Sequence, residues 1–539
     1  MNATATAREI VAALISGGAR DVVLAPGSRS APLAYAIAQA EAAGRLRVLV
    51  RVDERAAAFS ALGIALATGR PVAIVTTSGT AVANLYPALA EADAAAVPLL
   101  ALTADRPREL WRTGANQTTN QVAMFDNVAR ACLHLDADAT NASAVVAEAL
   151  AAARGLSSPA PGPVQLNVSF RPPLTPETGD EPAPLPEADW QAPPAPAGAD
   201  IAEVLAGLEA PVVVAGDKAD HIAGLAEAIT ATATPVFAEP SSNLRDLPSA
   251  LTSYVALLAD SPLAAEISDV VIAGHPTLTR PVTELISRPD PAPIVLAAHD
   301  RYTDLTGGAA RVVRVAAGEP GARGELPQLP ETPWLAAWLA ADRAVAARPA
   351  TPLERAALTV WQDSARQGLD LLVGSSSTIR ALDRFAPARE AHAGLRVWAN
   401  RGLAGIDGTI ATGWGLALGS GRPVRIVCGD LTFFHDASAM LRGRLEASVD
   451  LQVIVLNDAG GSIFAGLEHG ELAATSEAGA RRFARYFATE QTGSIGGLAA
   501  AYGAGFARCR EEGLAPLLAA GVSGLTVIEV EVSANLQDR

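Results

Sequence analysis

Short runs of Val, Ile and Leu alternate with Ala-rich segments of helical periodicity along most of the chain. In the first 170 residues we expect strands within residues 21–27, 47–53, 71–79, 97–105 and 164–170. Helix-like segments separate most of these strands. Buried strands that alternate with helices predict an α/β fold, in which a parallel sheet is covered by helices on both faces.

Two further groups of the same kind follow. We expect strands within residues 211–216, 235–240, 269–276, 293–300 and 311–317, and then within 370–376, 396–402, 423–430, 451–458 and 525–532. Residues 172–200 hold nine prolines in 29 positions, which favours an extended linker. We therefore predict three doubly wound parallel-sheet domains, at residues 1–171, 201–333 and 334–539.

An internal repeat connects the first and third domains. Residues 61–80 and 413–432 align without gaps and are identical at ten of 20 positions. Shared Ala and Gly content inflates this score, but the common run G-R-P-V-x-I-V is harder to attribute to composition. We interpret the two domains as copies of one fold. The same offset pairs Ser78 with Asp430, and Glu54 with Ile406.

Composition and charge narrow the functional classes. The chain has 539 residues, of which 50% are hydrophobic and 18% charged, as is typical of a folded soluble protein. Its net charge of −16 argues against nucleic acid or an anionic membrane as a partner. Three distant cysteines, an N-terminus unlike a signal peptide and the lack of a long apolar run favour a cytoplasmic protein without a membrane span.

Two aspartates follow apolar strands of the third domain, in CGDLTFFHD and VLNDAGGSIF. One strand–helix–strand excursion separates Asp430 from Asp458, so the two are expected to meet at the carboxyl edge of the sheet. Two carboxylates and a backbone carbonyl suit Mg²⁺, and the glycines after Asp458 would let a diphosphate approach. Either dipeptide alone is more often part of a turn or an N-cap, whereas the pair favours a metal–diphosphate site.

The diphosphate is not expected to belong to ATP or NAD. The chain has no GxxxxGK[ST] motif, and no GxGxxG motif that follows a strand and opens a helix.

The arrangement resembles the thiamine-diphosphate enzymes, which combine such a metal motif with a glutamate before a helix of the first domain. Within that superfamily one family is similar over PGSRSAPL, VDER, TSGTAVANLYPALAEA, LTADRPRELWRTGANQT, NRGLAGIDGTI, GDLTFFHD and GGSIF. It is the MenD family, the 2-succinyl-5-enolpyruvyl-6-hydroxy-3-cyclohexene-1-carboxylate synthases of menaquinone biosynthesis. The resemblance is nearly continuous in the first and third domains and loose in the central one.

The resemblance implies that thiamine diphosphate lies between a pyrimidine-binding first domain and a diphosphate-binding third domain. Glu54 matches the glutamate that hydrogen-bonds the aminopyrimidine, although a carboxylate interacting with the helix dipole is the commoner fate of such a residue. Ile406 matches the apolar residue beneath the cofactor, and core packing would explain it equally well. The cofactor-binding residues implied are Glu54, Ile406, Gly429, Asp430, Leu431, Ile463 and Phe464.

The metal ligands implied are Asp430, Asp458 and the carbonyl of Gly460, with Mg²⁺ as the ion and Mn²⁺ as the alternative. The family often has Asn-Asn where this chain has Asn457-Asp458. An aspartate also offers an oxygen ligand, so this difference adds charge without removing the site. Asn457 is expected either to contact the metal or to support the turn.

The substrates implied are 2-oxoglutarate and isochorismate, two dianions that require arginines with carboxylate-binding geometry. A solvated salt bridge is the commoner role of a single arginine, and Arg280 has the loosest match. The substrate-binding residues implied are Ser28, Arg29, Arg106, Asn116, Gln117, Arg280, Arg380 and Arg401. Those implied for catalysis are Glu54, Ser376, Arg380 and Arg401.

The activity implied is decarboxylation of 2-oxoglutarate and conjugate addition of the succinyl unit to isochorismate, by a transferase. The resemblance also implies a homodimer or tetramer with active sites at the subunit interface. Another thiamine-diphosphate decarboxylase or carboligase, such as an acetolactate synthase relative, stays an alternative, but it lacks PGSRSAPL and NRGLAGIDG. A cofactor-binding homologue without turnover is the other alternative.

Overall fold

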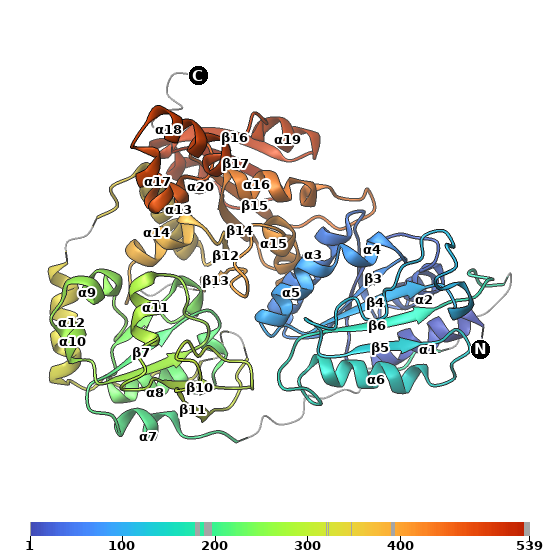
Figure 1. Ribbon diagram of the computed structural model, residues 1–539, viewed down its shortest axis with the longest axis horizontal. Helices are drawn as coiled ribbons and strands as arrows, with labels where there is room; N and C mark the ends of the chain where they lie inside the picture. Colours follow the sequence, from blue (N-terminus) through green and yellow to red (C-terminus); the bar gives the residue numbers. More distant parts are fainter. Residues whose placement is uncertain are drawn as a thin grey trace. The chain divides into compact units, whose positions relative to one another are not determined.

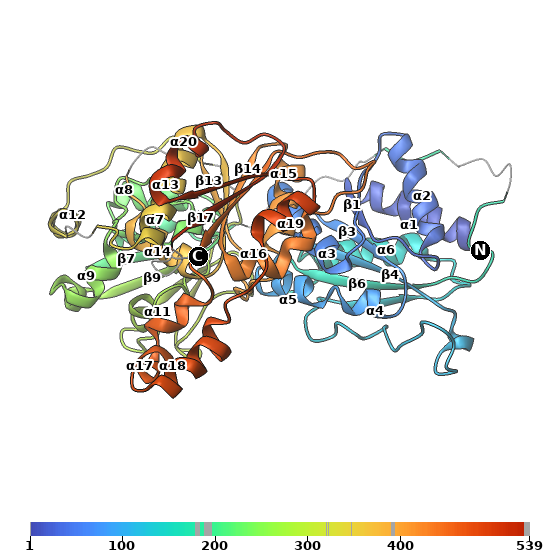
Figure 2. The ribbon, with the colours of Figure 1, turned by 90° about the horizontal axis from the view of Figure 1, so that it is seen from above.

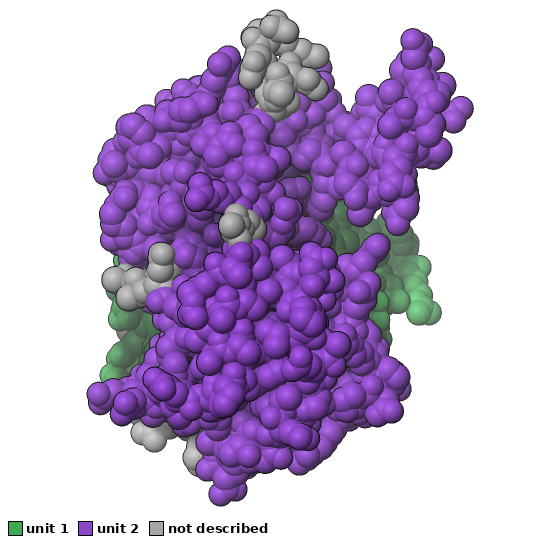
Figure 3. Space-filling model, turned by 90° about the vertical axis from the view of Figure 1, so that its left-hand side faces the viewer, with its two compact units in different colours: residues 1–193, 402–422, 436–449 green, residues 194–401, 423–435, 450–539 purple. Residues whose placement is uncertain are grey.

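The computed structural model describes residues 2–177, 184–187, 197–319, 321, 323–345, 348–389 and 394–532. Much of the predicted linker, residues 178–183 and 188–196, lies outside the described residues. The chain forms two compact units (Figure 3). The first comprises residues 1–193, 402–422 and 436–449, and the second comprises residues 194–401, 423–435 and 450–539. The predicted boundaries of three domains remain a prediction.

The first unit contains a six-stranded parallel sheet in the order β2-β1-β3-β4-β6-β5 (Figure 1). Its strands are β1 (Asp21–Leu24), β2 (Arg47–Val50), β3 (Val72–Thr76), β4 (Leu99–Asp105), β5 (Cys132–Leu135) and β6 (Pro163–Ser169). The helices along it are α1 (Ala3–Ser16), α2 (Ala31–Ala42), α3 (Glu54–Thr68), α4 (Thr80–Ala83), α5 (Tyr86–Ala94) and α6 (Ala142–Ala153). Apolar side chains of α1, α2 and α6 form one core with the strands, and α3 and α5 pack together elsewhere on the sheet (Figure 2).

The second unit contains two parallel sheets. The five-stranded sheet has the order β11-β10-β9-β7-β8, with β7 (Pro211–Ala215), β8 (Val236–Ala238), β9 (Asp269–Ala273), β10 (Ile294–Ala297) and β11 (Arg311–Arg314). The six-stranded sheet has the order β13-β12-β14-β15-β17-β16, with β12 (Asp370–Val373), β13 (Arg396–Trp398), β14 (Val424–Gly429), β15 (Leu451–Asn457), β16 (Gly505–Arg510) and β17 (Leu525–Glu531).

Short helices connect these strands. Along the five-stranded sheet they are α7 (Ile201–Ala206), α8 (Leu225–Thr232), α9 (Tyr254–Asp260), α10 (Leu263–Glu266), α11 (Arg280–Ile286) and α12 (Pro333–Ala344). Later in the chain come α13 (Pro352–Gln367), α14 (Ser377–Phe385), α15 (Thr409–Ser420), α16 (Asp430–Asp436), α17 (Glu468–Ala473), α18 (Glu477–Phe483), α19 (Ile495–Ala501) and α20 (Leu514–Leu518). The predicted α/β class with parallel sheets is therefore confirmed.

Every predicted strand is present, and two strands were missed. β5 has three half-buried residues and one buried residue, β16 has only half-buried and exposed ones, and each lies at the edge of its sheet. Their sequences, CLHL and GFARCR, lack the continuous apolar run by which the other strands were predicted.

The first and third sheets share one strand order, since β1 to β6 correspond to β12 to β17 in turn. The sequence repeat places α3 opposite α15, and these two helices pack against each other within the first unit. A Cβ added to Gly63 would lie 2.1 Å from the carbonyl oxygen of Thr412, and one added to Gly415 would lie 2.0 Å from that of Ser60. Because these pairs are interchanged by the repeat, the two helices meet across a pseudo-two-fold contact that requires glycine on both sides.

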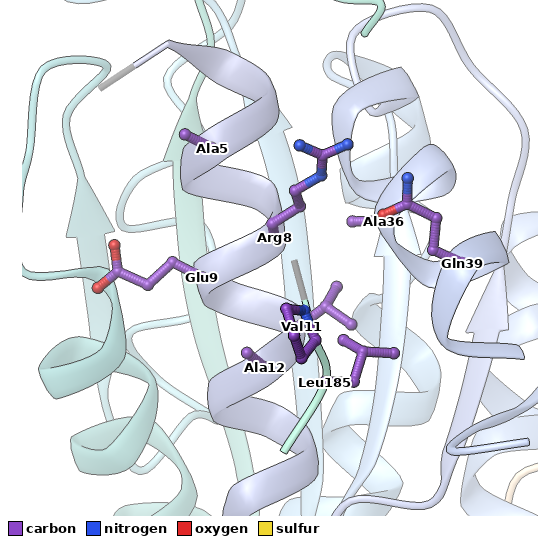
Figure 4. Close-up of a pocket in the computed structure, with 9 residues that line it drawn as sticks. Ala5, Arg8, Glu9, Val11, Ala12, Ala36, Gln39 and Leu185 are labelled. Carbon is purple, nitrogen blue, oxygen red and sulfur yellow. The ribbon is translucent and has the colours of Figure 1, made fainter. Parts of the chain in front are cut away.

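Residues 184–187 of the Pro-rich segment pack on the first unit. Glu187 accepts a hydrogen bond from Arg45 at 2.7 Å, and Leu185 lies against α1 and α2 (Figure 4). Together these elements line a hollow of about 340 Å³ that includes Val11 and Ala36. The hollow contains none of the residues that the sequence assigns to the site. Among the described residues, no helix is both long enough and apolar enough to cross a membrane.

Candidate active site

Helix α3 begins with two adjacent carboxylates that have different surroundings. Asp53 is the N-cap: its Oδ1 accepts the N–H of Ala56 at 3.2 Å, and its Oδ2 accepts the hydroxyl of Ser438 at 3.1 Å. Glu54, the first helical residue, is half-buried, and its carboxylate has no hydrogen bond or ion pair to any described residue. Asp53 therefore caps the N-terminus of α3. Because Glu54 is not needed for that role, its carboxylate is available for a ligand.

Ile406 lies three residues before α15, in a segment that belongs to the same unit as Glu54. Its side chain is 36% exposed. A core role, the alternative drawn from the sequence, would require burial. The exposure instead leaves an apolar surface for a ligand or another chain.

Four predicted substrate residues converge at adjacent strand ends of the first unit. Arg106 follows β4, and its Nη1 donates to the carbonyl of Gln117 at 2.9 Å and to the hydroxyl of Ser78, which follows β3. Gln117 has a φ of +59° and donates from Nε2 to the carbonyl of Ser78 at 3.0 Å. Ser28 and Arg29 follow β1, the neighbour of β3. Asn116 is exposed beside Gln117.

The two arginines of this group form no ion pair with a described residue, although the charge of Asp105 acts to raise the pKa of Arg29. Arg29 Nη1 donates to the carbonyl of Phe170 at 2.9 Å, while its buried Nε has no hydrogen-bond partner among the described residues. Burial and the nearby charge of Arg106 lower the pKa of Arg29. A carboxylate bound here would relieve both effects.

A second arginine pair lies in the second unit. Ser376 precedes α14, and its carbonyl accepts a hydrogen bond from Arg380 Nη1 at 3.1 Å. Ser375 donates to the carbonyl of Asn400 at 2.8 Å, which fixes the α14 turn beside Arg401. Burial and the charge of Arg401 lower the pKa of Arg380. Arg401 is buried, and its Nε has no partner among the described residues, so this pair also suits an anion.

Arg280 does not join this group in any described contact. It is the first residue of α11 and is exposed. Its predicted role in substrate binding remains a prediction.

Asp430 and Asp458 follow the adjacent strands β14 and β15, as predicted. The pKa of Asp430 is raised to about 7 by burial and then by the charge of Asp458. The pKa of Asp458 is also raised by burial. Two carboxylates of like charge, one buried and one half-buried, are costly alone, and a divalent cation between them would remove that cost.

The turn after β15 assigns Asn457 a supporting role in this structure. Its Oδ1 accepts the N–H of Ala459 at 3.1 Å, and its Nδ2 donates to Glu529 at 2.8 Å. Both polar ends of the side chain are therefore occupied within the protein. A Cβ on Gly460 would lie 2.2 Å from the carbonyl oxygen of Ala488, so this glycine also admits a neighbouring segment of the chain.

The remaining predicted cofactor residues surround these aspartates. The N–H of Leu431 donates to Asp430 Oδ1 at 2.9 Å, and a Cβ on Gly429 would meet no atom within 4 Å. Ile463 and Phe464 lie in the turn of residues 462–466 and are half-buried. Phe464 packs against Phe487 with ring centroids 5.9 Å apart. The space beside Gly429 and this apolar turn could flank a bound ligand.

Known proteins similar to this chain agree with these features. Residues 4–124 match the family described as "Thiamine pyrophosphate enzyme, N-terminal TPP binding domain". The 2-succinyl-5-enolpyruvyl-6-hydroxy-3-cyclohexene-1-carboxylate synthase of Arthrobacter sp. (strain FB24) is 44% identical, over 98% of this chain and 89% of the relative. Proteins of the same name from Paenarthrobacter aurescens and Kineococcus radiotolerans are each 43% identical, over 98% of this chain and 93% and 95% of their own lengths. The chain belongs to the 2-succinyl-5-enolpyruvyl-6-hydroxy-3-cyclohexene-1-carboxylate synthase family.

Family membership confirms the resemblance drawn from the sequence and supports thiamine diphosphate as the cofactor. The residues present fit that group. Asp430 and Asp458 offer hard oxygen ligands whose mutual repulsion a metal would relieve, and Gly429 leaves open space beside them. Among the described residues, no group of three or more His, Cys, Asp or Glu is arranged to hold a metal ion, so backbone, phosphate and water oxygens would complete the metal's coordination.

Ser78, Gln121 and Asn167 were not identified from the sequence. Ser78 binds Arg106 and Gln117, whereas Gln121 and Asn167 are fully buried beneath them. The sequence does contain a signal: Gln165 and Asn167 are polar residues in the apolar run VQLNVSF. Polar side chains in a buried strand require specific partners, and here those partners lie at the site.

Proposed function

We propose that the chain decarboxylates 2-oxoglutarate and adds the succinyl unit to isochorismate in menaquinone biosynthesis. The product is 2-succinyl-5-enolpyruvyl-6-hydroxy-3-cyclohexene-1-carboxylate, with release of CO₂. The observation that carries this proposal is the match of 98% of the chain to relatives named for that product. Two arginine pairs, in each of which the charge of one arginine lowers the pKa of the other, support it because both substrates are dianions.

Thiamine diphosphate, when bound, would supply a carbon nucleophile for the keto carbon and a cationic thiazolium ring that accepts the electron pair released with CO₂. Glu54 would hold a proton at the pyrimidine nitrogen N1′, a role for which its carboxylate has no competing partner among the described residues. Asp430, Asp458 and the carbonyl of Gly460 would bind Mg²⁺, or Mn²⁺ as the alternative ion, and so anchor the diphosphate. Ile406 would support the cofactor from below.

The arginines would bind and orient the substrate carboxylates. Arg29 and Arg106, with Ser28, Asn116 and Gln117, would serve one region of the site. Ser376, Arg380 and Arg401 would serve another, and Arg280 would lie at its margin. Ile463 and Phe464 would exclude water, which would otherwise protonate the reacting carbon and release succinic semialdehyde in place of the adduct.

We also propose that the protein is a homodimer or tetramer with sites between subunits in the cytoplasm. The first unit exposes apolar side chains on two short segments. Leu403 and Ile406 are 61% and 36% exposed, and Leu441 and Leu445 are 49% and 95% exposed. These exposed apolar groups support the proposal, because burying them against another chain would remove apolar surface from water.

The test is turnover by the purified protein with Mg²⁺, thiamine diphosphate and both substrates, measured as formation of the adduct. Glu54→Gln should lower kcat by about 10²-fold or more, because the amide cannot exchange the proton, while the Kd of thiamine diphosphate changes little. Asp53→Asn is the matched control, since an asparagine still caps α3. Succinic semialdehyde as the only product would refute the proposed addition step.

A further inference from the structure

A connected set of buried polar side chains lies beneath the substrate residues of the first unit. Thr103 is on β4, Gln165 and Asn167 are on β6, and Gln121 is in the segment after Arg106. All four side chains are fully buried. Buried polar groups are costly unless they are paired, so the pairing of these groups requires an explanation.

Gln121 joins two strand ends. Its Oε1 accepts the N–H of Gly79, after β3, at 3.3 Å. Its Nε2 donates to the carbonyl of Ala104, on β4, at 3.0 Å and to Asn167 Oδ1 at 2.7 Å. The backbone N–H can only donate and the carbonyl can only accept, so these contacts fix the orientation of the amide.

The Asn167 amide is saturated as a result. Its Oδ1 accepts from Gln121 and from the hydroxyl of Thr103 at 2.9 Å. Its Nδ2 donates to Asp105 Oδ2 at 3.0 Å and approaches His134 Nδ1 at 3.2 Å. Asp105 Oδ1 accepts the N–H of Arg106 at 2.7 Å. A continuous chain of hydrogen bonds therefore connects Gly79 with the backbone of Arg106.

Both ends of this chain adjoin the candidate substrate residues. Gly79 follows Ser78, whose hydroxyl donates to the carbonyl of Gln117 at 2.9 Å, and Arg106 is the other end. Gln165 Nε2 also donates to the carbonyl of Gln121 at 2.6 Å, and so holds the last residue of the segment 106–121 in place. The network therefore sets the position of Arg106 relative to Gln117 without itself reaching the surface.

We propose that Asn167 and Gln121 are positioning residues, which hold Arg106 and Gln117 in the geometry that binds a substrate carboxylate. The proposal rests on the proposed function for the identity of the substrate. Its structural part, that the amide network orders residues 106–121, stands independently of the reaction.

The test uses the isosteric variant Asn167→Asp, which replaces the donor facing Asp105 with a carboxylate oxygen. KM for at least one of the two substrates should rise about tenfold or more, while kcat and the Kd of thiamine diphosphate change less than about threefold. Thr103→Val, which removes one donor to Asn167 Oδ1, should raise the same KM by a smaller factor. If Asn167→Asp does not fold, Thr103→Val carries the test.

Val168→Ala is the control, because this neighbour on β6 belongs to the apolar core on the other face of the strand. A merely structural role would give Asn167→Asp and Val168→Ala the same KM at similar losses of stability. Amide hydrogen exchange supplies a readout that needs no substrate: residues 106–121 should exchange faster in Asn167→Asp than in Val168→Ala. Equal exchange would overturn the inference, whereas absence of turnover by the wild type would overturn the proposed function alone.

Discussion

At the scale of single residues, buried carboxyl groups dominate the electrostatics of the second unit. Asp383 on α14 is fully buried and accepts a hydrogen bond from the hydroxyl of Tyr254. Arg245 lies 3.8 Å from it. Burial raises the pKa of Asp383 to about 6, although the charge of Arg245 opposes that shift. The protein therefore holds a carboxyl whose charged form is disfavoured by folding.

This shift predicts the direction of a pH effect on stability. In the unfolded chain the pKa of Asp383 is about 3.8. Below that pH the carboxyl is protonated in both the folded and the unfolded state, so its ionisation does not lower the free energy of unfolding. Between about 4 and 6 the unfolded chain ionises first, and above about 6 the buried carboxylate opposes folding. Asp383 should therefore cost up to about 3 kcal/mol of unfolding free energy as pH rises through this window.

Urea unfolding of Asp383→Asn and wild type between pH 4.5 and 7 measures this effect. The variant should gain stability relative to the wild type as pH increases, because an amide does not ionise. Asp304→Asn is the control: a hydrogen bond from Thr306 lowers the pKa of Asp304, so that carboxyl is ionised in both states across this range. Parallel curves for Asp383→Asn and the wild type would contradict the prediction.

Some of the candidate site residues could be predicted from the sequence, and others could not. Asp430 and Asp458 were identified because each stands at the end of an apolar strand pattern, and the adjacency of β14 and β15 followed from the chain order. Glu54 stands where a strand pattern gives way to a helix, but its role was implied only by the family resemblance. Ser78 ends a strand pattern and pairs with Asp430 in the repeat, yet its contacts with Gln117 and Arg106 arise only in the folded chain. Gln121 has no such sequence signal, since its importance depends on its contact with Asn167.

At the scale of elements, the packing of α3 against α15 depends on glycines at equivalent positions of the repeat. Their Cα atoms lie so close to the facing backbone that even a methyl group would overlap a carbonyl oxygen. A backbone contact cannot yield as a side chain can, so relief requires the helices to separate. The identity of Gly63 and Gly415 in the aligned repeat therefore has a packing cause.

Gly63→Ala and Gly415→Ala should each lower the free energy of unfolding by about 3 kcal/mol, the cost of overpacking a rigid contact. Gly421→Ala is the matched control. Gly421 directly follows α15, the helix that contains Gly415, and has a φ of +66°. A Cβ added to it would meet no atom within 4 Å. The substitution should cost about 1 kcal/mol through backbone strain alone. Equal losses for Gly63→Ala and Gly421→Ala in thermal unfolding would show that the helix contact is not rigid.

The elements that sequence patterns missed share one physical cause. In both copies of the fold the unpredicted strand, β5 or β16, pairs on one side only, with β6 or β17. Cys132 and Leu133 are half-buried, and Phe506 is 43% exposed. Other edge strands such as β2 and β11 hold short runs of Val and Leu, whereas β5 and β16 interrupt theirs with polar residues and depend on pairing with a neighbour that the sequence does not reveal.

At the scale of the whole molecule, the residues proposed to bind the pyrimidine of the cofactor and those proposed to bind its metal belong to different units. Glu54 and Ile406 belong to the first, and Asp430 and Asp458 to the second. The apolar side chains exposed near Ile406 give the first unit a surface suited to a second chain. A site completed between subunits would require Glu54 of one chain and Asp430 of another.

Mixing two inactive variants tests that requirement. Glu54→Gln removes one half of the site and Asp430→Asn removes the other, so each homodimer should be inactive. In a heterodimer with sites shared between chains, one site combines both mutations and the other is intact. Coexpression of the two variants should therefore restore about a quarter of the wild-type turnover, since about half of randomly paired dimers are heterodimers with one intact site.

The outcome separates the two possible arrangements. If each site were built within one chain, every site would contain one mutation, and no mixture would recover activity. Differently tagged chains, purified in two affinity steps, would give heterodimers alone and raise the expected recovery to about half. Inactive heterodimers that still bind thiamine diphosphate would contradict a shared site, and would show that Glu54 and Asp430 act from the same chain.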